Sequence, residues 1–389
     1  MEKKRKKIIL MYDFFSEPGG IERIMLFQAR TLKKAGYDVS FAFAYVDEKL
    51  RAERLAEFPV IEYSKFMIKA ETLQICSSLV SDGKMESFNG TDLVICHSFP
   101  SSYFALRMQN KLKIPYILHL HHPPQFLYTA DASWANNSFK RKFSYTFGKI
   151  LRPLLRRFDK YCVTSAKDYL IECESVNRII KEIYGISSGT VTYPPFDPVF
   201  KIVKCSMKDL EKFGITKKYI LGSGRIIKQK RFDYLVEAFS NLKNKDLQLV
   251  IAGKYSEEMK KELDDLANKK GVKLLFLGSL NIEDLVRVYN LASVTVLTCP
   301  KEWFGLVPIE AMACGCPVVA WKDNFGPEES ISEGIGGFLA KPYDTEDLTR
   351  KISLALSKKW NREAIRKSVS KFSEDAVAKK LINKIDQIV

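Results

Sequence analysis

The chain has 389 residues, enough for two domains of ordinary size, and its 46% hydrophobic and 28% charged residues are typical of a folded globular protein rather than a disordered one. No uninterrupted run of about 18 apolar residues occurs, which argues against a transmembrane helix. The formal net charge of +16 favours a polyanionic partner: nucleic acid, an acidic membrane face or a phosphate-bearing substrate.

The eight cysteines are scattered along the chain and form no CxxC pair, so we interpret them as small apolar residues rather than as metal ligands. The apolar run that follows the basic N-terminus stops at Asp13, which makes it too short for the apolar region of a secretory signal. Unpaired cysteines without such a signal predict a cytoplasmic protein.

Short apolar runs alternate with helical patterns, such as those at 23–36 and 232–242, along the whole chain. Runs that are apolar throughout are typical of strands in parallel sheets with both faces covered, and two series of them predict an α/β protein with two doubly wound, Rossmann-like domains. We predict strands at 6–12, 38–45, 92–98, 116–122 and 160–166, and then at 219–225, 247–253, 272–278, 294–299, 316–321 and 336–340.

The first predicted strand is followed by Gly19 and Gly20, a tight loop before a helix that could accommodate a phosphate. The four histidines end two later strands: His97 ends one, and the sequence HLHH, residues 119–122, ends the next. Three histidines so close together could ligate zinc, but no acid or cysteine at a suitable spacing completes a set. We therefore favour hydrogen bonds from these histidines to a sugar or a phosphate.

Residues 139–160 predict a basic amphipathic helix that carries eight basic residues and one acid. Its apolar side chains, among them Leu154 and Phe158, fall on one stripe at helical spacing, and Pro153 bends or splits the helix. One interpretation is a helix that packs on the domain core with a solvated basic face. The other is peripheral docking on an anionic membrane, to which each basic residue near the surface contributes about 1 kcal/mol.

Pro194, Pro195 and Pro198 disfavour regular structure and predict the change of domain. We expect an N-terminal domain at 1–195, a C-terminal domain at 196–371 and a final helical segment at 372–389. Because ligands of open parallel sheets bind beyond the carboxyl ends of the strands, the functional residues should follow strands directly.

The second candidate loop begins where a strand ends at Gly222-Ser223-Gly224. Arg225 follows the last glycine, and Lys230 precedes the next helix. Flexible glycines with two cations suit a bound diphosphate, because arginine can bind two oxygens at once and lysine adds a point charge. A basic turn on the surface is the alternative interpretation of this loop alone.

The third candidate loop contains two acids, Glu302 and Glu310, with seven residues between them. Pro308 suits the first turn of a helix that begins after Glu302 and contains Glu310, and the free amides of Phe304, Gly305 and Leu306 would lie near its start. A helix N-terminus attracts a phosphate, and carboxylates beside it can accept hydrogen bonds from sugar hydroxyls. Acids that merely stabilise the helix dipole remain the alternative.

Together these motifs resemble those of the retaining glycosyltransferases of family 4. The similarity rests on Glu302-x7-Glu310 within EWFGLVPIEAMACGCPVVA, on GRIIKQKRFDYLVEAF at 224–239, and on PGGIER, the strand-end histidines, IAGKY and FLGSL in the expected order. The segments EWFGLVPIEAM and NFGPEES are most similar to α-mannosyltransferases that extend lipid-linked oligosaccharides from GDP-mannose. Tyr255 and Arg231 depart from the family pattern, which has glycine at both positions.

The resemblance implies a GT-B fold, with two Rossmann-like domains that face each other across a cleft and a last helix that returns to the N-terminal domain. The N-terminal domain would bind the acceptor and the C-terminal domain the nucleotide sugar. Arg225 and Lys230 would contact the diphosphate, Glu310 the ribose and Glu302 the donor hexose. The implied catalytic residues are Arg225, Lys230, Glu302 and His121, and the implied nucleotide-sugar contacts are Gly19, Gly20, Gly224, Phe304, Gly305, Leu306 and Glu310.

The implied reaction moves a hexose, best matched by mannose from GDP-mannose, to a glycan or lipid-linked acceptor with an α linkage. Because the chain contains no Asp-x-Asp and Arg225 and Lys230 can stabilise the departing diphosphate, we expect neither a metal nor another cofactor. A UDP-glucose or UDP-N-acetylglucosamine transferase of the same fold is one alternative, and a non-catalytic polyanion-binding protein is another. No nucleic-acid-binding motif is recognised, so we expect no nucleic-acid partner. We expect a cytoplasmic enzyme that lies peripherally at the cytoplasmic membrane face.

Overall fold

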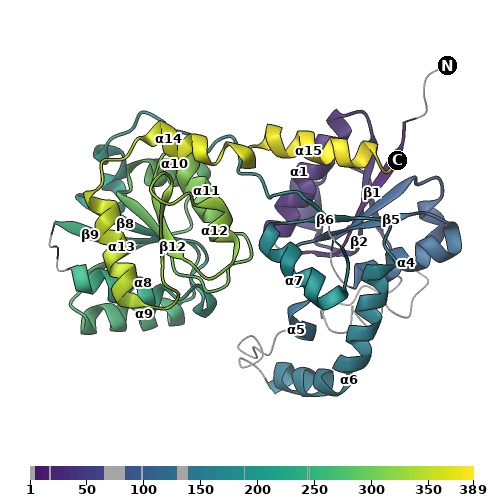
Figure 1. The fold of residues 1–389 in the computed structure, drawn as a ribbon, viewed down its shortest axis with the longest axis horizontal. Coiled ribbons are helices and arrows are strands. Elements are labelled where there is room, and N and C mark those ends of the chain that lie inside the picture. The colour runs from purple at the N-terminus through teal and green to yellow at the C-terminus, as the bar shows by residue number, and fades with distance from the viewer. Residues whose placement is uncertain are drawn as a thin grey trace. The chain divides into compact units, whose positions relative to one another are not determined.

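The computed structural model describes residues 5–16, 19–64, 84–97, 100–128, 139–187, 189–242, 244 and 246–389, without the side chains of 125–126 and 139–151. The chain divides into two compact units (Figure 1). The first contains Met1–Tyr193 and Ala378–Val389, and the second contains Pro194–Val377. The sequence prediction changed domain at residue 195 and separated 372–389; in the structure the change follows Tyr193, and the chain returns to the first unit at Ala378.

The first unit is built on a seven-stranded sheet with the order β3-β2-β1-β4-β5-β6-β7, in which every pair of neighbours is parallel. The central strands are apolar on both faces, and β4 and β5 are buried along their whole length, as the unbroken apolar runs predict. The strands are β1 (Lys7–Phe15), β2 (Asp38–Val46), β3 (Val60–Glu62), β4 (Leu93–His97), β5 (Tyr116–Leu120), β6 (Tyr169–Ile171) and β7 (Thr190–Val191).

Helices of the first unit connect these strands and cover the sheet (Figure 1). The amphipathic helix α1 buries Met25, Ala29 and Leu32 in the same apolar cluster as strands β1 and β2. The helices are α1 (Gly20–Lys34), α2 (Glu48–Arg54), the 3₁₀ helix η1 (Met85–Phe88), α4 (Ser101–Leu112), α5 (Gln125–Tyr128), α6 (Phe139–Thr164) and α7 (Glu174–Tyr184).

The strand predicted at 160–166 is wrong, because α6 continues through Thr164 and the strand β6 follows later, at Tyr169–Ile171. A short apolar run cannot by itself distinguish a strand from the end of a buried helix. In this helix Asp159 and Val163, four residues apart, are both buried, and the Thr164 hydroxyl donates to the Lys160 carbonyl at 2.9 Å. Pro153 lies inside this helix, which continues on both sides of it.

The second unit is built on a six-stranded sheet with the order β10-β9-β8-β11-β12-β13, again with every pair of neighbours parallel. Both sheets therefore have the doubly wound, parallel arrangement that the sequence predicts. The strands are β8 (Lys218–Ser223), β9 (Leu247–Ala252), β10 (Leu274–Gly278), β11 (Val294–Leu297), β12 (Val318–Trp321) and β13 (Gly337–Ala340).

The helices of the second unit include α8, which begins and ends at the residues that the sequence predicts. Its apolar face joins a core cluster that contains Leu235, Val236 and Trp321. The helices are η3 (Met207–Phe213), η4 (Lys228–Lys230), α8 (Phe232–Leu242), α9 (Glu257–Lys269), α10 (Ile282–Leu291), α11 (Leu306–Ala313), α12 (Gly326–Ser330), α13 (Thr345–Ser357), α14 (Arg362–Ser368), η5 (Ser370–Phe372) and α15 (Glu374–Asp386), whose last residues belong to the first unit.

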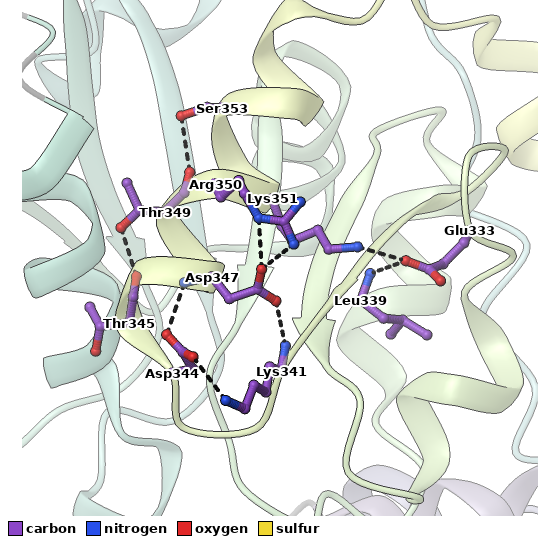
Figure 2. A network of polar contacts seen from close by, with 10 residues as sticks. All are labelled: Glu333, Leu339, Lys341, Asp344, Thr345, Asp347, Thr349, Arg350, Lys351 and Ser353. Atoms are coloured by element: carbon purple, nitrogen blue, oxygen red, sulfur yellow. Dashed lines mark hydrogen bonds and ion pairs between the residues drawn. The ribbon is translucent and has the colours of Figure 1, made fainter.

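A polar network fixes the connection from β13 to α13 (Figure 2). Asp344 caps α13 by accepting from the Asp347 amide at 3.0 Å, and Asp347 accepts from the Lys341 amide at 2.7 Å. Glu333 accepts from both the Leu339 amide and the Lys351 ammonium at 3.1 Å. These contacts hold α13 against the sheet and involve none of the predicted site residues.

Helix α15 returns the chain to the first unit. Leu381 and Ile385 are buried in the apolar cluster of that unit, together with residues of α1, β1 and β2. Lys384 pairs with Asp168 at 2.5 Å, and the Lys167 ammonium donates to the Ile388 carbonyl at 2.9 Å. The last turns of the chain thus complete the core of the first unit.

Candidate active site

Lys230 and Glu302 form an ion pair at the carboxyl edge of the second sheet. Lys230 ends η4, in the loop after β8, and Glu302 lies in the loop after β11, which is the neighbour of β8 in the sheet. Their side chains are 22% and 19% exposed, so the pair is partly shielded from water but open to a ligand. Sequence reasoning identified both residues but did not predict that they pair with each other.

The pKa shifts of the two residues indicate that both are charged. Burial alone would raise the pKa of the Glu302 carboxyl, but Lys230 and a hydrogen bond from Cys299 outweigh it and hold that pKa below its ordinary value. Burial alone would lower the pKa of Lys230, but the Glu302 carboxylate raises it above the ordinary value. Without a ligand, each charge therefore neutralises the other.

Hydrogen bonds from side chains to backbone carbonyls join the two loops that carry this pair. The Thr298 hydroxyl donates to the Lys230 carbonyl at 3.0 Å, and the Cys299 thiol contacts the Gln229 carbonyl at 3.5 Å. The Trp321 indole, at the end of β12, donates to the Thr298 carbonyl at 2.9 Å. The relative position of Lys230 and Glu302 is consequently set by three strand ends rather than by their own ion pair alone.

Gly305 forms the turn between Glu302 and helix α11. Its φ of +80° lies in the left-handed region that favours glycine, and an added Cβ would lie 3.0 Å from the Glu302 Cγ. Leu306 begins α11, so the first amides of this helix point toward the carboxyl edge, as in an anion site. Phe304 is 1% exposed and contacts the Phe372 ring at 5.3 Å, so its backbone, and not its ring, can contact a ligand.

Glu310 lies in the middle of α11 and is 5% exposed. Burial raises the pKa of Tyr289, and the nearby Glu310 carboxylate raises it further. The Tyr289 hydroxyl contacts the Ser223 hydroxyl at 2.9 Å. Glu310 is thus close to Tyr289 and to the end of β8. A ligand would have to reach a carboxylate that is covered in this structure.

Gly224 and Arg225 follow β8 directly. Gly224 has a φ of +129° and open space around it, while Arg225 is exposed. The positive charge of Arg225 lowers the pKa of Lys230 and also lowers the pKa of Glu302, so it acts on both members of the ion pair. The structure therefore brings Arg225, Lys230 and Glu302 together in one electrostatic cluster.

In the first unit, Gly19 and Gly20 lie at the start of α1, where no side chain caps the helix at Gly19. His121 lies just beyond β5 and is 2% exposed. Its Nδ1 contacts Glu172 at 2.8 Å and its Nε2 contacts His97 Nδ1 at 2.9 Å, so both ring nitrogens already have protein partners. His121 is placed at a strand end as predicted, but its ring does not present a free nitrogen.

Sequence reasoning missed two partners of these histidines, Glu172 after β6 and Gln28 on α1, whose amide contacts His119 Nδ1 at 2.8 Å. One nitrogen from each of His97, His119 and His121 lies within 4.8 Å of the others, a possible metal-ligand group. The hydrogen bond between His97 and His121 uses a proton on one ring and the lone pair on the other. We therefore interpret the group as a buried hydrogen-bonded network rather than a metal centre.

Comparison with known proteins adds the family. Residues 18–198 match the model described as Glycosyltransferase Family 4, and residues 207–372 match the model described as Glycosyl transferases group 1. Mannosylfructose-phosphate synthase of Agrobacterium fabrum is 27% identical over 369 residues, which cover 86% of this chain and 77% of the relative. Alpha-1,3/1,6-mannosyltransferase ALG2 of Homo sapiens is 24% identical over 272 residues, 64% of this chain and 61% of ALG2.

Among solved structures, a sucrose-phosphate synthase from Thermosynechococcus elongatus superposes with a TM-score of 0.78 at 18% identity, covering 99% of both chains. At that identity the likeness shows the fold alone. The two parallel α/β units and these matches define a glycosyltransferase with the GT-B fold. The chain belongs to glycosyltransferase family 4.

Proposed function

We propose that this protein is a retaining hexosyltransferase that moves mannose from GDP-mannose to a glycan or lipid-linked acceptor, with an α linkage. The second unit would bind the nucleotide sugar and the first unit the acceptor. The observation that carries the proposal is the Lys230–Glu302 pair, two opposite charges from loops 72 residues apart beside the start of α11.

The pair suits the charge changes of glycosyl transfer. Cleavage of the sugar–phosphate bond builds negative charge on the diphosphate and positive charge on the sugar ring. Arg225, Lys230 and the first amides of α11 would stabilise the diphosphate, an effect of about 3–4 kcal/mol for one good donor. When the Lys230 ammonium pairs with the diphosphate instead of with Glu302, the Glu302 carboxylate can accept hydrogen bonds from hydroxyls of the donor sugar.

Three further roles follow in this proposal. Glu310 would accept from the ribose hydroxyls once the cover over its carboxylate opens. Gly224, Gly19 and Gly20 would let the diphosphate approach the backbone closely. His121 would contact the donor only by exchanging one of its hydrogen bonds, to His97 or Glu172, for a substrate hydroxyl.

The choice of mannose is supported by the names of the two relatives, a mannosylfructose-phosphate synthase and a mannosyltransferase. The test is a panel of GDP-mannose, UDP-glucose and UDP-N-acetylglucosamine, measured by isothermal titration calorimetry and by slow donor hydrolysis. We expect the protein to bind and hydrolyse GDP-mannose in preference to the two UDP sugars. Binding of only the UDP sugars would overturn the donor assignment, and binding of none would overturn the transferase proposal.

We also propose that transfer needs no divalent metal, because Arg225 and Lys230 supply the positive charge that a metal would otherwise bring to the diphosphate. Activity should therefore survive dialysis against EDTA with less than about a twofold change. A complete loss that Mg²⁺ or Mn²⁺ restores would show that the two cations are insufficient.

Finally, we propose peripheral docking on an anionic membrane through helix α6. No helix among the described residues is both long and apolar enough to cross a bilayer. The described end of α6 exposes Leu154 to 67% and Tyr161 to 56%, with Arg157 and Lys160 exposed beside them. Exposed apolar, aromatic and basic side chains on one helix suit the boundary between lipid headgroups and acyl chains.

A further inference from the structure

The loop that carries Glu302 is held by a second loop, which follows the neighbouring strand β12. The first loop runs from Cys299 to Gly305 and is strained at Lys301, whose φ is +49°. The second runs from Lys322 to Phe325 and leads into α12 at Gly326. Its last two residues, Asn324 and Phe325, begin the motif NFGPEES, which continues through α12 to Ser330. Neither the geometry of the Lys230–Glu302 pair nor the proposed reaction assigns a role to this motif.

Gly326 contacts the backbone of the Glu302 loop directly. Its amide donates to the carbonyls of Glu302 and Trp303, both at 3.1 Å. A Cβ at this position would lie 2.2 Å from Phe304 Cα and 2.5 Å from the Phe304 and Trp303 carbonyl oxygens. These are backbone atoms, which cannot rotate away as a side chain can, so any larger residue would displace the loop.

Two further contacts fix the rest of the loop. Asp323 accepts from the Lys301 amide at 2.7 Å, which stabilises the strained residue directly before Glu302. The Phe325 and Trp303 rings pack edge to face at 5.3 Å. Three consecutive residues of the Glu302 loop, from Lys301 to Trp303, therefore each have a partner in the segment from Asp323 to Gly326.

We infer that Asp323 and Gly326 are positioning residues for transfer, because they set the position of the Glu302 carboxylate and of the Phe304–Leu306 amides. Neither residue needs to touch the substrate. The inference rests on the proposed function for its effect on activity, but its structural content holds whichever sugar nucleotide is the donor. A displacement of about 1 Å in catalytic geometry can lower a rate by about a hundredfold.

The decisive variant is Gly326→Ala, and the matched control is Gly337→Ala. A Cβ at Gly337 would lie 1.8 Å from the Val318 carbonyl oxygen, so the control suffers a similar backbone overlap in the same unit. Gly337 begins β13, at the amino edge of the sheet and thus at the opposite end from the Glu302 loop. The two variants therefore separate a general loss of stability from a local displacement of the loop.

The structural readout needs no substrate. The protein is labelled with 5-fluorotryptophan, and the resonance of Trp303 is assigned among the four tryptophans with Trp303→Phe. We expect Gly326→Ala to shift or broaden the Trp303 resonance in ¹⁹F NMR and Gly337→Ala to leave it in place. An unchanged Trp303 resonance in folded Gly326→Ala would overturn the inference.

Asp323 provides a second pair of variants if Gly326→Ala does not fold. Asp323→Asn keeps an oxygen that can accept from the Lys301 amide, whereas Asp323→Ala removes it. We expect the alanine variant to move the Trp303 resonance and to lower kcat/KM for GDP-mannose by about tenfold or more, and the asparagine variant to retain both. Equal behaviour of the two variants would contradict the role of the Asp323 oxygen.

The readouts also separate this inference from the proposed function. A displaced Trp303 resonance in a protein that binds no sugar nucleotide would leave the positioning contacts standing and remove the transferase proposal. A displaced resonance with unchanged kcat/KM would show that the loop does not carry the catalytic groups.

Discussion

At the scale of single residues, Lys230 and Arg225 differ in what they do before a substrate arrives. Lys230 neutralises Glu302 in an ion pair, whereas Arg225 is exposed and acts on the pair through the electrostatic effect of its charge. The proposed reaction nevertheless gives both the same role, which is to stabilise the charge of the departing diphosphate. Their substitutions should therefore resemble each other in turnover and differ in the state without ligand.

We expect Arg225→Ala and Lys230→Ala each to lower kcat by about a hundredfold or more, as for the loss of transition-state charge stabilisation. Lys230→Ala should also destabilise the protein, because it leaves the Glu302 carboxylate partly buried without its cation. Steady-state kinetics and thermal unfolding measure the two effects. Lys228→Ala, an exposed lysine in the same turn, is the control, and near-normal turnover in either test variant would refute the leaving-group role.

Asp13 makes a different prediction, about pH and stability. This residue of β1 is 3% exposed, and burial raises its pKa to about 7 although the Ser101 amide and the Tyr63 hydroxyl donate to its carboxylate. The unfolded chain releases this proton near pH 4, whereas the folded protein keeps it until about pH 7. The folded state thus binds more protons in that window, so stability falls as pH rises through it.

Asp13→Asn should remove this loss, because the amide is neutral at every pH and keeps an oxygen for the Ser101 amide. We expect the variant to be more stable than the parent at pH 8, by at most about 4 kcal/mol for a pKa that rises from about 4 to about 7, and by less than about half of that at pH 5, where only the first part of this window has been crossed. Differential scanning calorimetry at the two pH values measures the difference. Asp38→Asn, at an exposed position, is the control, and an equal change at both pH values would count against the titration of Asp13.

At the scale of elements, the sequence pattern predicted best the strands that are buried in the middle of a sheet. It also predicted both ends of α8 correctly. The mistaken strand at 160–166 had a consequence for the candidate site. Because the true strand β6 ends at Ile171, Glu172 occupies the strand-end position where ligand-binding residues are expected, and the mistake concealed it. Likewise, no local pattern could indicate that Gly326 would lie against Phe304, since that contact depends on how two loops fold together.

Helix α6 shows a second difference between pattern and structure. The sequence pattern places Leu154 on the same apolar stripe as Phe158, but Phe158 packs on Tyr103 at 4.6 Å whereas Leu154 is 67% exposed. Leu155 of the stripe is half-buried, and its other apolar side chains, at 139–151, lie outside the described side chains. Arg156 is also less available to contact lipid headgroups than its charge suggests, because its guanidinium donates to the Leu127 carbonyl at 2.7 Å.

The membrane proposal is therefore tested with Arg157→Glu/Lys160→Glu, which leaves the Arg156 contact intact. In liposome flotation we expect the parent to bind vesicles with acidic lipids at low salt, and the variant to lose most of that binding. Lys208→Glu/Lys359→Glu makes the same change of net charge at exposed positions of the second unit and should still float. Equal binding of the parent to neutral and acidic vesicles would exclude electrostatic docking.

At the scale of the whole molecule, two doubly wound halves were predictable because buried parallel strands are apolar throughout and alternate with helices. The candidate residues of the second unit were predictable because they follow strands directly. Their pairing was not, since Lys230 and Glu302 meet only after β8 and β11 become neighbours. The course of the last helix was expected only from the resemblance to family 4, since the amphipathic pattern of α15 does not reveal which core it joins.

The return of α15 to the first unit has a consequence for how the molecule is made (Figure 1). Leu381 and Ile385 leave the ribosome after every other buried residue of the apolar cluster that they complete. While the second unit is synthesised, part of the core of the first unit therefore stays exposed to solvent and to chaperones. Vectorial synthesis thus couples the two halves in time, and the half that begins first is finished last.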